Sequence, residues 1–546
     1  MKQFKKLFAM ILAVLMLVSV ISACGVAPAA PAADGSADEQ AEAEEEAGAE
    51  EGEAGELSAY DQAIADRKAK AEETGEYTKV THLIFTWTGE PAGMKRVQDA
   101  MNEILREKLG LEVELTMMDA ASYRQNVRLM LTSGEEQVDW FSSTMLGYSG
   151  LVNDEYLLDL EENDLLQTYG PGILQTLKQE YLDACRFGGV LYGLPPVKDY
   201  AYRAGCVMID KEALDAIGYE YEEVNQEVQS SWDEVEHIFE LLLEKFPDKY
   251  PYAIIANQLS QHIFMDGIGG DMYGVLVEPD KSLEVVNAFE SDQFREICER
   301  MYRWNQKGFI SKDALSDDTA ASARIRSGQY LAYISQSKPG YKTQVMAECG
   351  KEMILFICGD DCIKSTGCNN TLHSLSQACE DPVAAMQYMN ALYTDEELSN
   401  LIVWGQEGTD YVLTDDGHIT FPEGVDGNNA EYYHSMNWEL PNSYIAHSWV
   451  GDPLDLGAKI MEFNDGARKS LALGFTFDNS DLVTEYTALQ NVYDEYAKTL
   501  LFGFVDPDDP EKGIDAFNEA LYAVGLQKYM DAKAEALAAW AEENGK

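Results

Sequence analysis

The most constraining feature of the sequence is an alternation of apolar runs and amphipathic segments between residues 80 and 142. Residues 80–87 read Val-Thr-His-Leu-Ile-Phe-Thr-Trp, which is typical of a buried strand. Residues 94–109 carry apolar side chains at helical spacing, and a glycine follows, as it often does at a helix end. The pattern repeats, with strands predicted at 111–117 and 138–142 and a helix at 121–132. This order predicts parallel strands with right-handed crossovers, and therefore an α/β fold.

Open sheets of this type bind ligands beyond the carboxyl ends of their strands. In this sequence those ends are residues 87–90 and 142–148. No GxGxxG or GxxxxGK[ST] pattern follows the first strand. The sequence therefore indicates a ligand site at these strand ends, but not one for nucleotide phosphates.

The first 23 residues have the pattern of an export signal. Three lysines precede an apolar run over residues 7–20, which is short for a membrane-spanning helix. Small residues then lead into Cys24, so the segment resembles the lipobox of bacterial lipoproteins. We expect a signal peptide over 1–23 and acyl chains on Cys24, each buried CH₂ contributing about 0.8 kcal/mol to anchoring on the extracellular face of the cell membrane. The alternative is an ordinary secretory signal with an incidental cysteine.

An acidic linker follows, and the folded part is acidic too. Residues 24–57 hold eleven acidic residues and almost nothing apolar, so this segment is expected to be disordered. The whole chain carries −56, and without the three signal lysines and the eleven linker acids the formal charge is still −48. Such a field repels a phosphate backbone, so nucleic acid is excluded as a partner. No other apolar run reaches membrane length.

The cysteine pattern gives no clear metal site. Cys358, Cys362 and Cys368 followed by His373 superficially resemble zinc ligands, but the spacing lacks a paired CxxC. A disulfide in this region, or buried free thiols, is the preferred interpretation. We expect neither a metal nor a cofactor.

Three later segments carry a family resemblance. Residues 191–195 read Leu-Tyr-Gly-Leu-Pro, residues 404–413 read Trp-Gly-Gln-Glu-Gly-Thr-Asp-Tyr-Val-Leu, and residues 474–478 read Gly-Phe-Thr-Phe-Asp. Helices are predicted after the last of these, at 481–501, 513–524 and 526–543. With the lipobox, these segments resemble family 1 extracellular solute-binding lipoproteins of carbohydrate ABC transporters, in particular the LplA-like subgroup. The resemblance covers residues 75–546.

The resemblance implies a two-lobed, periplasmic-binding-protein-like α/β fold with a hinge. The solute-binding domain would occupy residues 58–546, with lobe 1 at about 75–197 and 331–392. Lobe 2 would occupy about 198–330 and 393–546, including a helical C-terminal segment at 475–546. A monomer of this kind would capture a sugar, here an oligosaccharide, between the lobes and deliver it to the permease subunits of the transporter.

The candidate ligand-binding residues are aromatic or polar side chains near the expected cleft and hinge. Trp87 ends the first strand and either stacks on a sugar ring or covers core. Arg203 either binds a sugar oxygen or pairs with a structural aspartate. Trp438 and Trp449 are also considered, but they are left out of the site. The predicted set is Trp87, Ser143, Thr144, Tyr148, Tyr200, Tyr202, Arg203, Trp404 and Tyr411.

Two other classes of function share some of these sequence features. A peptide-binding or adhesin-type surface lipoprotein would share the anchor and the aromatic content. A secreted glycosidase needs two carboxylates at a defined separation, and with 96 acidic residues a pair arises by chance. No GxSxG or HExxH pattern occurs. The sequence therefore favours a binding protein rather than an enzyme.

Overall fold

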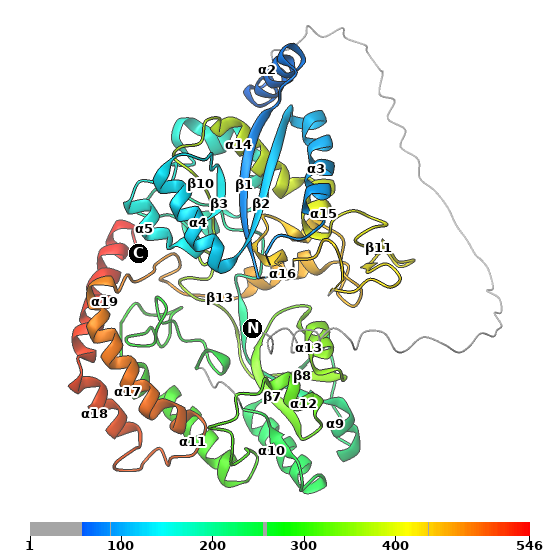
Figure 1. Ribbon diagram of the computed structural model, residues 1–546. Coiled ribbons are helices and arrows are strands. Elements are labelled where there is room, and N and C mark those ends of the chain that lie inside the picture. Colours follow the sequence, from blue (N-terminus) through cyan, green and yellow to red (C-terminus); the bar gives the residue numbers. More distant parts are fainter. Residues whose placement is uncertain (1–56, 88, 255–258, 428, 435) are drawn as a thin grey trace, which may run out of the picture.

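Two separate sheets organise the chain into an upper and a lower lobe (Figure 1). The computed structural model describes residues 57–546 except 88, 255–258, 428 and 435. The predicted signal peptide, Cys24 and almost all of the acidic linker lie outside the described residues. Within the described part, none of the helices combines the length and apolar character needed to cross a bilayer.

Lobe 1 is built on a four-stranded sheet in the order β10-β3-β1-β2. The strands β1, β2 and β3 are parallel, as the sequence predicts, and β10 is antiparallel to β3. Their bounds are Thr78–Thr86 (β1), Leu111–Asp119 (β2), Trp140–Ser142 (β3) and His373–Leu375 (β10).

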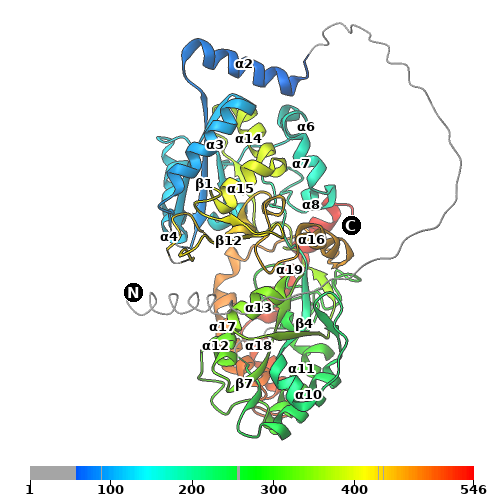
Figure 2. The ribbon, with the colours of Figure 1, turned by 90° about the vertical axis from the view of Figure 1, so that its right-hand side faces the viewer.

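Side chains alternate along β1, and this alternation creates two cores in lobe 1. Val80 and Ile84 pack with α3 and α14, whereas Leu83 and Phe85 pack with α4 on the opposite face. Figure 2 shows these two layers on either side of β1. The lobe 1 helices are α2 (Ala59–Thr74), α3 (Met94–Leu109), α4 (Ala120–Ser133), α5 (Tyr148–Asn153), α6 (Leu165–Tyr169), α7 (Pro171–Thr176), α8 (Gln179–Asp183), α14 (Pro382–Thr394), α15 (Glu396–Trp404) and α16 (Leu456–Gly466).

Lobe 2 repeats this construction around β4. Val207 and Ile209 face the core covered by α10 and α11, and Cys206 and Met208 face the core covered by α12 and α13. The strands are β4 (Tyr202–Asp210), β5 (Glu227–Gln229), β6 (Tyr250–Tyr252), β7 (Tyr330–Ser337), β8 (Met353–Ile357), β9 (Asp361–Ile363) and β13 (Arg468–Lys469). The helices are α9 (Lys211–Ile217), α10 (Trp232–Lys245), α11 (Asp292–Gln306), α12 (Ala321–Arg326) and α13 (Tyr341–Cys349).

The lobe boundaries differ from those expected. Residues 331–357 were assigned to lobe 1, but β7, α13 and β8 belong to lobe 2 because β7 and β8 both pair with β4. Residues 393–466 were assigned to lobe 2, but α15 packs on α3 in lobe 1 and Phe463 of α16 joins the lobe 1 core. The chain crosses between the lobes at the start of β4, at β9 and at β13, and these three strands pair side by side.

The predicted C-terminal helices are confirmed as α17 (Val483–Leu501), α18 (Ile514–Ala523) and α19 (Leu526–Glu543). Leu489, Phe517 and Tyr529 bury these helices against the core of lobe 2. In Figure 1 they run along the left side of the molecule, away from α13. The C-terminal segment is therefore part of the second lobe rather than an independent unit.

The eight described cysteines are free thiols, and six of them are buried. The sequence left open a disulfide or buried free thiols in this region, and the structure has free thiols. Among the described residues, no group of three His, Cys, Asp or Glu side chains is arranged to hold a metal ion.

Candidate functional site

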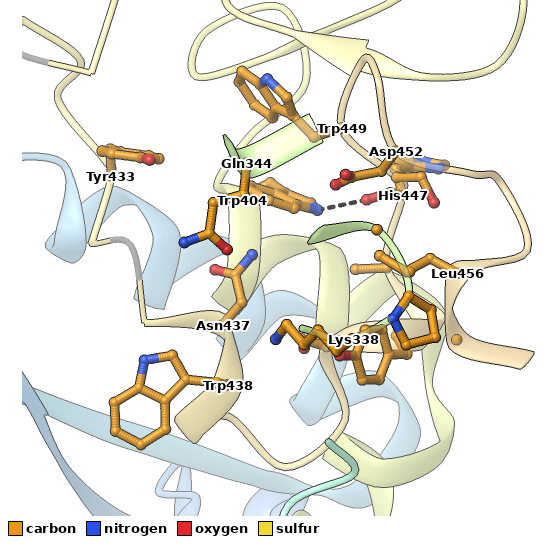
Figure 3. Close-up of a pocket in the computed structure, with 17 residues that line it drawn as sticks. Lys338, Gln344, Trp404, Tyr433, Asn437, Trp438, His447, Trp449, Asp452 and Leu456 are labelled. Carbon is orange, nitrogen blue, oxygen red and sulfur yellow. Dashed lines mark hydrogen bonds between the residues drawn. The ribbon is translucent and has the colours of Figure 1, made fainter. Parts of the chain in front are cut away.

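A cavity of about 360 Å³ opens between the lobes (Figure 3). Lobe 1 contributes the end of α15 and the long irregular segment from Tyr433 to Gly457. Lobe 2 contributes Lys338, Pro339 and Gly340, which directly follow β7, and Gln344 of α13. The cavity is thus built by both lobes at the end of a central strand of lobe 2. Because its largest side chains are Trp404, Trp438 and Trp449, it is called the tryptophan cavity below.

Aromatic rings form much of its wall. Trp404 and Trp449 lie against each other at a tilt of 39°, with ring centroids 5.4 Å apart. The Trp404 indole N–H donates to the carbonyl oxygen of His447 at 2.9 Å, which fixes the orientation of that ring. Tyr433, Trp438 and Tyr444 complete the aromatic lining. Rings held in this way offer flat apolar faces with a polar edge.

Polar groups lie between the rings. Figure 3 shows the amides of Gln344 and Asn437 beside each other, between Trp404 and Trp438. Lys338 pairs with Asp199 at 2.9 Å across the lobes. Burial raises the pKa of the Asp452 carboxyl, although Lys338 and His418 oppose this shift. The wall therefore offers both hydrogen-bond donors and acceptors.

Lys198 is a functional candidate that the sequence reasoning missed. Its ammonium donates to Asn370 Oδ1 at 2.6 Å and Thr371 Oγ1 at 3.1 Å. It also lies 5.6 Å from the centroid of the Trp438 ring. The residue is only 8 % exposed, and burial lowers the pKa of this amine to about 8. Its position just after the Pro195-Pro196 turn was the available signal.

Trp87 lies on the surface at the end of β1 rather than in the core. Its side chain is 61 % exposed and touches Phe85 edge-on at 5.9 Å. Phe85 also contacts Trp438, which is 37 % exposed, at 5.9 Å. The two tryptophans therefore flank one ring on the side of lobe 1 that faces lobe 2. The interpretation of Trp87 as core is excluded, and its contact with a ligand stays a prediction.

Three predicted ligand contacts are instead internal contacts of lobe 1. The Ser143 hydroxyl is buried and bonds to the Leu372 carbonyl at 3.3 Å and the Ser374 hydroxyl at 2.8 Å. The Tyr148 hydroxyl donates to the Cys185 carbonyl at 3.0 Å, and the Tyr200 hydroxyl donates to the Pro196 carbonyl at 2.8 Å. Each hydroxyl is satisfied where it lies, which local sequence could not reveal.

The remaining predicted residues divide between the hinge and the tryptophan cavity. Arg203 forms ion pairs with Glu227 and Asp361. Of the two roles expected for it, the structure therefore has the pairing with a structural aspartate. Tyr202 lies under Lys364, 4.9 Å from the ammonium to the ring centroid.

Tyr411 is buried and meets His447 edge-on at 6.1 Å, behind the cavity wall. Among the predicted residues whose side chains the structure describes, Trp404 is the one that lines the tryptophan cavity. Thr144 begins a short 3₁₀ turn (Thr144–Leu146), and its side chain lies outside the described part.

Two α/β lobes, three crossing strands and a cavity between the lobes define the fold class of two-lobed solute-binding proteins. The comparisons agree with this class. A curated Streptococcus pneumoniae protein, named carbohydrate ABC transporter substrate-binding protein, is 21% identical over 481 residues, which are 85% of this chain and 90% of that protein. The predicted resemblance to carbohydrate solute-binding proteins is confirmed, and the LplA-like subgroup stays a prediction.

Solved structures show the same fold. The N-glycan transport solute binding protein NgtS from Streptococcus pneumoniae superposes with a TM-score of 0.72 at 19% identity, covering 86% of this chain and 100% of that one. A milk-oligosaccharide-binding solute binding protein from Bifidobacterium longum infantis gives 0.55 at 16% identity, covering 84% and 98%. The profile of a domain of unknown function, DUF3502, matches residues 471–542, which include α17, α18 and all but the last residue of α19.

Proposed function

We propose that this protein captures an oligosaccharide in the tryptophan cavity and delivers it to the permease of an ABC transporter. Lipid on Cys24 would hold it on the extracellular face of the membrane. The observation that carries the proposal is the lining of an interlobe cavity by three tryptophans with amides between them. Flat rings stack on the apolar faces of pyranoses, and amides exchange hydrogen bonds with hydroxyls. Similar proteins named for N-glycans and milk oligosaccharides support the same ligand class.

A glycosidase is not supported by the cavity. Glycoside hydrolysis uses two carboxyl groups roughly 5–9.5 Å apart that face the scissile bond. Among the described residues that line the tryptophan cavity, Asp452 is the one carboxylate. The protein is therefore proposed to bind its ligand without chemical change.

The test is calorimetric titration with a panel of saccharides of graded length. The lipidated full chain is purified in a detergent without a sugar head group, because a glycosidic detergent would compete. The panel holds Man1GlcNAc and Man5GlcNAc, kestose, and milk oligosaccharides of two to six residues. Saturable binding of one series, weakened at least tenfold by Trp404→Ala, is expected. Binding of extended peptides with no response to any saccharide would favour the peptide-binding alternative.

A further inference from the structure

A second cavity, of about 310 Å³, lies in lobe 2 beside α17 and next to the hinge. Its lining comes from lobe 2 residues 259–273, from Lys364 beyond the hinge strand β9, and from Tyr486, Gln490 and Tyr493 of α17. In Figure 1, α17 lies on the opposite side of the molecule from α13, which contributes to the tryptophan cavity. The second cavity is called the tyrosine cavity below.

Its wall contains a strained, glycine-rich loop. Ile268, flanked by Gly267 and Gly269, has a φ of +45°. A β-branched residue rarely adopts this conformation, and it persists only where the surroundings hold it. Here the Ile268 amide donates to Asp266 Oδ1 at 2.8 Å, and its carbonyl accepts from the Phe477 amide at 3.0 Å. Strain of this kind concentrates at ligand sites.

The same loop is fastened to the hinge. Asp266 Oδ2 accepts from the Ser365 amide at 2.7 Å, and Asp266 Oδ1 bonds to the Ser365 hydroxyl at 3.0 Å. Ser365 directly follows Lys364. The loop, the hinge turn and the C-terminal region therefore form one rigid wall around the cavity, so a ligand there would meet a preformed surface.

Lys364 presents an ammonium with no hydrogen-bond or ion-pair partner among the described residues. It rests over the Tyr202 ring, whose buried hydroxyl also has no partner in that part of the chain. The neighbouring carboxylate of Asp271 is already engaged, by Lys533 at 2.8 Å and by the Tyr529 hydroxyl at 2.7 Å. The Asp266 carboxylate acts on this ammonium only through its charge, so the partly shielded ammonium can still donate hydrogen bonds to a ligand.

The rest of the lining repeats the chemistry of the tryptophan cavity. Tyr273, Tyr486 and Tyr493 supply rings, and the Tyr273 hydroxyl donates to Gln490 Oε1 at 3.1 Å. The Gln490 amide nitrogen also donates to Asp494 Oδ1 at 2.8 Å, so the two bonds fix this side chain and leave one amide hydrogen to donate to a ligand. Rings with an oriented amide and a spare ammonium suit a polyhydroxylated ligand, whereas the charge of −48 on the folded part disfavours an anion.

The end of β7 contacts the walls of both cavities. The Gln336 side chain, near the end of β7, donates to the Ser260 carbonyl in the wall of the tyrosine cavity at 3.1 Å. Lys338, two residues further along, lines the tryptophan cavity. Two residues of extended chain span about 7 Å. With the reach of the Gln336 side chain added, the two walls are separated by more than one sugar unit, which an oligosaccharide can span.

We propose that the tyrosine cavity is a second saccharide subsite, which holds the distal neutral sugar unit of the oligosaccharide bound in the tryptophan cavity. Lys364 and Gln490 donate hydrogen bonds to its hydroxyls. The inference rests on the proposed function. It makes the DUF3502-matching helices part of the ligand site and lets them set the preferred length of the oligosaccharide.

The test compares short and long members of one saccharide series on the lipidated full chain, beginning with Man1GlcNAc and Man5GlcNAc. Lys364→Met removes the ammonium and keeps the stem. Gly270→Leu fills the cavity at a position where an added Cβ meets no atom within 4 Å. Lys528→Met, which removes an exposed lysine paired with Glu485 outside the cavity, is the matched control.

Lys364→Met is expected to weaken the long saccharide about tenfold, the cost of one charge-assisted hydrogen bond. Gly270→Leu is expected to weaken it at least as much, because the leucine fills the space of the distal sugar unit. Each variant should change the affinity for the short saccharide less than twofold. The control should change neither. Unchanged affinity for the long saccharide in both variants, or equal losses for short and long, overturns the subsite but leaves the proposed function intact. If no series of the panel binds the wild type, the proposed function itself fails.

Discussion

Replacement of Lys198 by methionine tests whether the cleft carries a charge that costs stability. The amine is 8 % exposed, and its pKa falls from 10.5 to about 8, chiefly because burial penalises the charged form. Between these two pKa values the unfolded chain binds the proton more tightly than the folded one. The free energy of unfolding must therefore rise with pH through this window, by about 1.4 kcal/mol per pH unit. Over the window the contribution is about 3 kcal/mol.

The assay is urea unfolding of the wild type and Lys198→Met from pH 7 to 10.5. Taking the difference between the two proteins cancels every other titrating group. We expect the wild type to gain up to about 3 kcal/mol relative to the variant across this range. The variant also loses packing and the hydrogen bonds to Asn370 and Thr371. This loss shifts the difference in unfolding free energy by the same amount at every pH and leaves its slope against pH unchanged. A difference that does not change with pH would refute the reasoning, because Lys198 would then titrate as it does in water.

Three further predictions concern the surface, the anchor and the chemistry. Trp87→Ala should weaken saccharide binding at least tenfold with a nearly unchanged melting temperature of the ligand-free protein, since the ring is 61 % exposed; a large loss of stability at unaltered affinity would contradict this. Cys24→Ala should abolish labelling with a palmitate analogue and release the protein from membranes, and continued labelling would disprove the anchor. The wild type should release no reducing sugar from bound glycans, and turnover lost on replacing one carboxylate would establish an enzyme.

Local structure could be predicted from the sequence wherever a periodic pattern ends in a clear stop. The helix Met94–Leu109 was predicted at its observed bounds because apolar spacing is regular and Gly110 adopts the left-handed conformation at its end. The start of α10 follows a local rule of the same kind: Ser231 accepts a hydrogen bond from the Glu234 amide, and a serine three residues before a glutamate is a common sequence signal for a helix start.

Lobe assignment could not be predicted in this way. The strands β7 and β8 join β4 through pairing between residues more than 100 positions apart, and no local pattern records that choice. The lining of the candidate cavity was predicted only in part, for a related reason. Trp404 ends a regular helix within a familiar motif, whereas Trp438 and Trp449 lie in irregular chain whose course depends on contacts with both lobes.

The three crossings of the chain between the lobes have a consequence for how the protein is made. The lobe 1 sheet begins with β1 but needs β10, and its core needs α14, α15 and Phe463 of α16. Lobe 2 begins with β4 but buries its core only when Phe517 and Tyr529 have been added near the C-terminus. Neither lobe can therefore complete itself from an N-terminal fragment. A growing chain therefore stays incompletely folded over most of its length, and truncation at either lobe boundary should yield an insoluble product.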